Sequence, residues 1–148
     1  MSNYQHILIA TDLESDSNII AERGVALARD QQARLSIIHV VELIPIDIED
    51  GLIVPQVQAL ENSLQKLAQS KLTQLVTDLN LPQTAINVAI GNPKYEITTY
   101  AKEQQVDLIV VGKHRRRGLA RLLGSTANGV VNHALCDTLI VNLGSSTD

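Results

Sequence analysis

Between residues 110 and 126 the chain contains Val110-Val111-Gly112-Lys113-His114-Arg115-Arg116-Arg117-Gly118 and, shortly after, Leu122-Leu123-Gly124-Ser125-Thr126. An apolar strand leads into a glycine and a cationic loop, and a second glycine with two hydroxyl residues opens a helix. Backbone N–H groups at a helix start favour anions, and glycine lets the backbone approach a phosphate closely. The stretch therefore predicts a strand–loop–helix unit whose loop holds a ligand.

The same alternation of strand and helix runs through the whole chain. Short apolar runs predict strands, and segments with apolar residues at helical spacing lie between them. Five strands alternating with four helices predict one α/β domain, residues 1–148, in which helices cover both faces of a parallel sheet. Ligands of such sheets bind beyond the carboxyl ends of the strands. The predicted strands are residues 6–10, 35–41, 85–90, 108–111 and 138–141.

Helix boundaries and inner faces follow from local signals. Asn92 is expected as an N-cap with Pro93 in the first helical position, and Pro82 closes the turn before the third strand. The first helix ends near residue 32, the third near 105, and the last begins at Ser125 or Thr126. The expected buried stripes are Ile20, Gly24, Leu27 and Ala28; Val57, Leu60, Leu64, Leu67, Ala68, Leu72, Leu75 and Leu79; and Ala127, Val130, Val131 and Ala134.

Composition and charge narrow the function classes. Apolar residues make up 45% of the 148, without Phe or Trp, so the core must be aliphatic. The net charge is −4, yet five of the twelve Lys and Arg residues lie between residues 113 and 121. This asymmetry favours a local anion site and argues against nucleic-acid binding. The single Cys136 excludes an internal disulfide, and no apolar run approaches the ~20 residues that span a bilayer. We expect a cytoplasmic protein without membrane contact.

Four segments that follow one another in the expected order along the chain suggest a family. They are Ile7-Leu8-Ile9-Ala10-Thr11-Asp12, Ser36-Ile37-Ile38-His39-Val40, Gly91-Asn92-Pro93, and the stretch from Gly112 to Ser125 that ends in Leu139-Ile140-Val141. Together they resemble the universal stress protein family over nearly the whole chain. The resemblance implies a five-stranded parallel sheet of order 3-2-1-4-5, and either an ATP-binding stress protein or a relative without a nucleotide.

The resemblance also implies a binding site after strand four. In ATP-binding members that loop has a glycine, two residues, a second glycine, nine residues, and then Gly-Ser or Gly-Thr. Here Arg115 replaces the second glycine, and eight residues, 116–123, precede Gly124. Arginine disfavours a close backbone approach but brings a guanidinium to the phosphates. The implied nucleotide-binding residues are Ala10, Thr11, Asp12, Val40, Val111, Gly112, His114, Arg115, Gly124, Ser125 and Thr126.

Each of these residues also has a structural interpretation. Asp12 suits a turn before the first helix, Ala10 and Val40 suit strand ends, and Ser125 or Thr126 suits an N-cap. The four histidines show no metal-ligand spacing, so no zinc site is expected. Asp12 is the only carboxylate expected near the phosphates, and no catalytic residue is assigned.

Three functions remain open on the sequence. The first is a stress-response protein that acts by binding ATP or AMP, with Mg²⁺ if the ligand is ATP. The second is a slow ATPase or phosphotransferase, and the third is a dimeric interaction protein without a nucleotide. The last strand, Thr138-Leu139-Ile140-Val141-Asn142, lacks the proline or lysine that blunts an exposed edge. The family's common arrangement pairs such edges, so we expect a homodimer through this strand.

Overall fold

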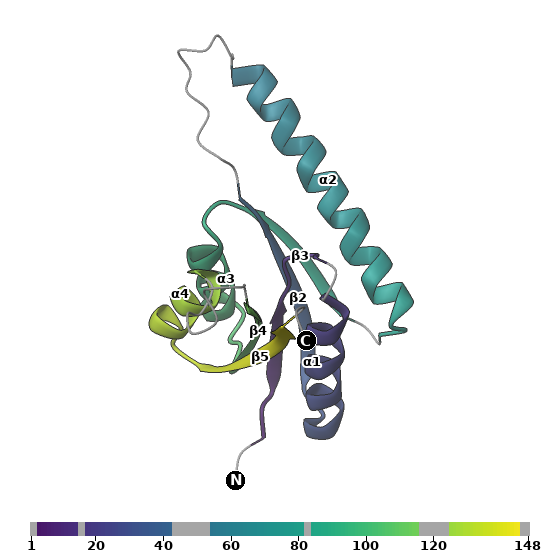
Figure 1. The fold of residues 1–148 in the computed structure, drawn as a ribbon, viewed down its shortest axis with the longest axis vertical. Helices are drawn as coiled ribbons and strands as arrows, with labels where there is room; N and C mark the ends of the chain where they lie inside the picture. The colour runs from purple at the N-terminus through teal and green to yellow at the C-terminus, as the bar shows by residue number, and fades with distance from the viewer. Residues whose placement is uncertain (1–2, 15–16, 43–53, 82–83, 116–124, 146–148) are drawn as a thin grey trace.

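A computed structural model describes residues 3–14, 17–42, 54–81, 84–115 and 125–145. Figure 1 shows α1 and α2 on one side of the sheet and α3 and α4 on the other. The five strands are parallel and lie in the order β3-β2-β1-β4-β5, as predicted. The elements are β1 His6–Ala10, α1 Ser17–Gln31, β2 Arg34–Val41, α2 Val54–Asp78, β3 Ala85–Ile90, α3 Pro93–Glu103, β4 Leu108–Arg115, α4 Ser125–His133 and β5 Asp137–Ser145.

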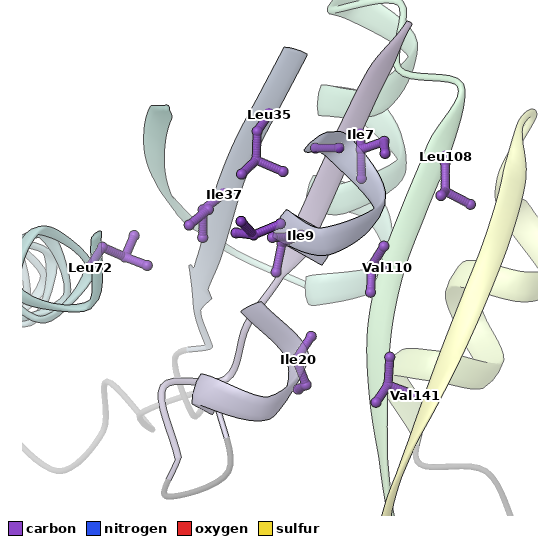
Figure 2. Close-up of a cluster of buried hydrophobic side chains, with 11 residues drawn as sticks. Ile7, Ile9, Ile20, Leu35, Ile37, Leu72, Leu108, Val110 and Val141 are labelled. Carbon is purple, nitrogen blue, oxygen red and sulfur yellow. The ribbon is translucent and has the colours of Figure 1, made fainter. Parts of the chain in front are cut away.

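Alternation along the central strand divides the core into two layers. All of β1 is buried, and its side chains point to opposite faces in turn. Ile7 and Ile9 belong to the cluster under α1 and α2, where Leu72 of α2 joins them (Figure 2). Leu8 and Ala10 belong to the cluster under α3 and α4. An unbroken aliphatic run is therefore what a strand covered on both faces requires.

The first helix meets the sheet through a glycine. Ile20, Gly24 and Ala28 are buried as predicted. A Cβ at Gly24 would lie 2.5 Å from Cδ1 of Ile9, which is fully buried. Glycine is therefore required at this position because α1 lies close against β1.

The prediction that one continuous stripe of α2 is buried was wrong. Ala68, Leu72 and Leu75 are buried, but Leu60 and Leu67 are 45% and 52% exposed. In Figure 1 the amino-terminal half of α2 extends beyond the sheet. Apolar spacing indicates which face of a helix is apolar, but it does not show how far the sheet beneath that face extends.

Two further predictions need correction in the carboxyl-terminal half. Val131 is 45% exposed, not buried, and Gly129 is buried in its place on the inner face of α4. The fourth strand continues past Val111 to Arg115, pairing with β5 up to Ser145 with an irregularity after Lys113. The first residues assigned to the cationic loop therefore extend the sheet.

The predicted cap of α3 is confirmed, since the Asn92 side chain accepts a 3.1 Å hydrogen bond from the Lys94 N–H. The expected turn at Pro82 lies outside the described residues.

Candidate functional site

A cleft of about 810 Å³ opens at the carboxyl ends of β1, β2 and β4. The loop after β1 and the first residues of α3 and α4 contribute to its walls, and the middle of α2 forms another side. This volume lies within the ~300–1,000 Å³ typical of ligand pockets. The parallel sheet thus places its cleft where the topology predicts.

Most of the sequence-predicted site residues lie around this one cleft. His114 and Arg115 belong to β4, but their side chains lie outside the described part of the structure, and so does Gly124. The residues that line the cleft are Ala10, Thr11, Asp12, Val40, Val111, Gly112, Ser125 and Thr126.

The loop after β1 has its own hydrogen-bond framework. The Thr11 N–H donates to the carbonyl oxygen of Ile38 at 3.0 Å, which holds the loop to β2. The Thr11 hydroxyl accepts from the Leu13 N–H at 3.0 Å, and Asp12 Oδ1 accepts from the Glu14 N–H at 2.9 Å. Asp12 therefore has the turn-stabilising role considered as its structural interpretation. Its exposed carboxylate still lines the cleft.

His39 also lines the cleft, although it is not among the site residues expected from the sequence. Its Nδ1 lies 2.8 Å from the carbonyl oxygen of Thr11. A carbonyl only accepts, so Nδ1 carries the proton, and in the neutral ring Nε2 is an acceptor. His39 lines the cleft and ties the end of β2 to the loop after β1.

Packing also requires glycine at position 112, in addition to the expected close approach of a phosphate. A Cβ at this position would clash with Cδ1 of Ile20 and lie 3.0 Å from Cδ1 of Leu143. Ile20 is only 2% exposed and has little room to move. The glycine thus lets α1 and β5 approach β4 at the edge of the cleft.

The wall that α2 contributes was not predicted. Four residues at helical spacing line the cleft from this helix: Leu64, Leu67, Ala68 and Lys71. Three of them belong to the predicted apolar stripe, but no local signal indicates that the stripe passes over the carboxyl ends of the strands.

Charges around the cleft differ from the expectation that Asp12 would be the only carboxylate. Glu14 and Glu42 also line it, and Lys71 brings a cation from α2.

Among the described residues, no group of three His, Cys, Asp or Glu side chains is placed to hold a metal ion. None of the described helices is both long and apolar enough to cross a bilayer.

Comparison with known proteins agrees with this geometry. The sequence profile of the universal stress protein family matches residues 3–142. This chain belongs to the universal stress protein family. Universal stress protein A homolog 1 of Coxiella burnetii is 34% identical over 139 residues, which cover 94% of this chain and 96% of the relative.

Solved universal stress proteins share the fold. Universal stress protein UspA from Lactobacillus plantarum superposes with a TM-score of 0.72 at 27% identity, covering 95% of this chain and 99% of that one. A crystal structure of a universal stress protein in complex with cAMP has a TM-score of 0.65 at 22% identity, covering 97% and 100%. These two solved structures therefore share the overall fold of this chain.

Proposed function

We propose that this protein acts as a cytoplasmic stress-response protein by binding an adenine nucleotide in the cleft at the carboxyl ends of β1, β2 and β4. The single observation that carries the proposal is the convergence of eight predicted site residues, from four elements and one loop, on a cleft of about 810 Å³. A structural neighbour of the same family was crystallised with cAMP, which supports an adenine nucleotide as the ligand.

The lining of the cleft combines two kinds of chemistry. Val40, Val111 and Ile97 supply aliphatic surface suited to the face of a base. Ser125 and Thr126 open α4, where hydroxyls and backbone N–H groups suit phosphate oxygens. This combination matches a ligand with an apolar ring at one end and an anion at the other.

Binding without efficient turnover fits the charges best. Phosphoryl transfer needs Mg²⁺ and a group that orients the attacking nucleophile. Asp12, Glu14 and Glu42 line the cleft, but Asp12 already accepts a hydrogen bond within its turn. We therefore assign no catalytic residue, and Mg²⁺ would enter with ATP.

Calorimetry with ATP, AMP and cAMP tests the proposal. The wild-type chain should release saturable heat with at least one of them. Thr126→Phe puts a ring into the cleft and should abolish that heat. Thr99→Phe, on the exposed side of α3 away from the cleft, is the matched control and should bind normally. No heat with any nucleotide would refute the proposal, and Mg²⁺-dependent phosphate release at enzymatic rates would favour the ATPase.

The edge strand supports a second part of the proposal, a homodimer through residues 138–142. β5 forms one edge of the sheet. Leu135, just before β5, is 83% exposed, and Val131 on the neighbouring helix is 45% exposed. An edge strand beside exposed aliphatic side chains suits pairing with a second copy about a two-fold axis.

A further inference from the structure

A second cavity, of about 480 Å³, lies at the opposite end of the sheet from the nucleotide cleft. It is bounded by the end of α1, the turn into β2, and the first residues of β2 and β3. Two buried polar side chains, His6 and Ser36, form part of its lining and are 3% and 2% exposed. The proposed function makes no use of either residue.

The charged side chains of this cavity have one sign. Arg29 and Arg34 line it, and no carboxylate does so in the described part of the chain. The whole chain carries a net charge of −4, so a cavity with two guanidinium groups and no acid is a local exception. Such a site favours an anion, and planar guanidinium groups suit oxyanions in particular.

Among the described residues, the acceptor that the Arg34 guanidinium meets is Nδ1 of His6, which is also engaged elsewhere. His6 Nδ1 lies 3.1 Å from the carbonyl oxygen of Gln104 and 3.3 Å from Nη2 of Arg34. The carbonyl can only accept and the guanidinium can only donate, so the two partners require opposite protonation of the same nitrogen. Only one of these hydrogen bonds forms at a time.

The hydrogen bond between Nε2 of His6 and the Ser36 hydroxyl is compatible with the tautomer in which Nδ1 donates to Gln104. With the proton on Nδ1, Nε2 accepts from the Ser36 hydroxyl at 2.7 Å, and every polar atom of His6 and Ser36 is satisfied. The other tautomer would leave the shorter contact, to Gln104, without a proton. Burial lowers the pKa of His6 and the Arg34 charge acts in the same direction, against the hydrogen bond to Gln104 and the Asp107 charge, which raise it. The pKa is lowered on balance, so the doubly protonated ring is disfavoured. Arg34 is exposed and lines the cavity, so its guanidinium is then available to a ligand there.

The nearby helix end does not oppose an anion strongly. Carbonyl groups at a helix carboxyl terminus carry partial negative charge. Here the carbonyl oxygens of Ala28 and Arg29 accept hydrogen bonds from the N–H groups of Ala33 and Gln32, at 2.8 and 3.3 Å. These two carbonyls of residues that line the cavity are thus occupied within the turn.

We propose that this cavity is a second ligand site, for a small oxyanion, a phosphate or a carboxylate, held by Arg34 and Arg29. The anion supplies the acceptor that His6 cannot offer to Arg34 while it donates to Gln104. The proposal stands independently of the nucleotide cleft, because the two cavities share no lining residue.

Amide NMR titration at constant ionic strength tests it, with inorganic phosphate in one series and acetate in the other. Saturable shifts in residues 28–36 and 85 are expected in at least one series, and the responding series identifies the oxyanion. Arg34→Gln and Arg29→Gln should each weaken the affinity at least tenfold. Arg23→Gln, an exposed arginine of α1 that does not line the cavity, should leave the affinity unchanged.

The same spectra separate this site from the cleft. Phosphate that enters the cleft would instead shift Gly112 and Thr126, whose response bears only on the proposed function. Shifts in residues 28–36 that never saturate in either series, or that persist in both arginine variants, would overturn the second site. Two variants are used because Arg34 also contacts His6, and Arg29→Gln tests the site without touching that contact.

Discussion

The Nδ1 of His39 donates a 2.8 Å hydrogen bond to the carbonyl oxygen of Thr11. This bond joins the end of β2 to the loop after β1, beside the 3.0 Å bond from the Thr11 N–H to Ile38. Both backbone groups of Thr11 are thereby tied to β2, and the wall of the cleft has a defined shape before any ligand enters.

Loss of the His39 bond should lower stability. His39→Leu removes the donor and leaves the carbonyl of buried Thr11 without that partner, which should reduce the free energy of unfolding by about 1–2 kcal/mol. Urea denaturation measures this. His133→Leu is the control, because His133 is exposed and its Nδ1 also donates at 2.8 Å, but to the carbonyl of Gly129 within the same helix, so its loss releases no loop. Equal losses in both variants would contradict the role assigned to His39.

Substitution of either of two helical glycines by alanine should lower stability. At Gly24 the new Cβ meets fully buried Ile9 at 2.5 Å, so overpacking of ~1–3 kcal/mol should outweigh the ~1 kcal/mol helix preference for alanine. At Gly129 the new Cβ meets Cβ of Lys94 at 2.7 Å, and because that atom is attached to the backbone of α3 it cannot swing aside. Thermal unfolding should show a lower Tm for Gly24→Ala and for Gly129→Ala. A higher Tm for Gly24→Ala would mean that α1 is free to shift from β1, and a higher Tm for Gly129→Ala would mean that α4 is free to shift from α3.

His6 should make stability depend on pH. Burial lowers its folded-state pKa below the ordinary value of 6.5, so between the two values the unfolded chain binds more protons than the folded chain. The contribution of His6 is complete above pH 6.5 and is lost as the pH falls below it. Urea denaturation at pH 7.5, 6.5 and 5.5 should show this loss in the wild type and a smaller one in His6→Gln. His133→Gln is the control, and an unchanged pH dependence in His6→Gln would rule out this source.

Arg115 tests the phosphate end of the nucleotide cleft. If its guanidinium contacts phosphate, Arg115→Ala should lower the affinity for ATP much more than the affinity for adenosine. The difference should shrink at high salt because the contact is electrostatic. Calorimetry with both ligands at two salt concentrations measures the effect. Equal losses for ATP and adenosine would indicate that the residue supports only the fold.

The exposed aliphatic residues beside β5 test the dimer. Leu135→Glu places a charge where the wild type has a side chain that is 83% exposed, so the fold should remain while a dimer interface is disrupted. Light scattering should show a dimer for the wild type and a monomer for the variant. Leu60→Glu, on the exposed part of α2, is the control and should remain dimeric. A wild-type chain that is already monomeric at micromolar concentration would end the proposal.

The sequence by itself determined the elements and their layers. The unbroken run His6–Ala10 predicts a strand buried on both faces, and Asn92 before Pro93 predicts the start of α3. These are local signals, because strand burial, capping and helix spacing depend on residues close together in the chain. The carboxyl-end location of the cleft also follows, since the helices that alternate with parallel strands bring every strand's carboxyl end to one edge.

Only the tertiary structure decided which side chains meet across the sheet. Leu64, Leu67, Ala68 and Lys71 of α2 line the cleft, and Leu60 of the same apolar stripe is 45% exposed. His6 on β1 meets Ser36 and Arg34 on β2 at a second cavity. Helical spacing shows that a face is apolar, but it does not show where along the neighbouring strands that face lies. Such contacts depend on the register and separation of elements far apart in the sequence, which are set when the core of Ile7, Ile9 and Leu72 packs.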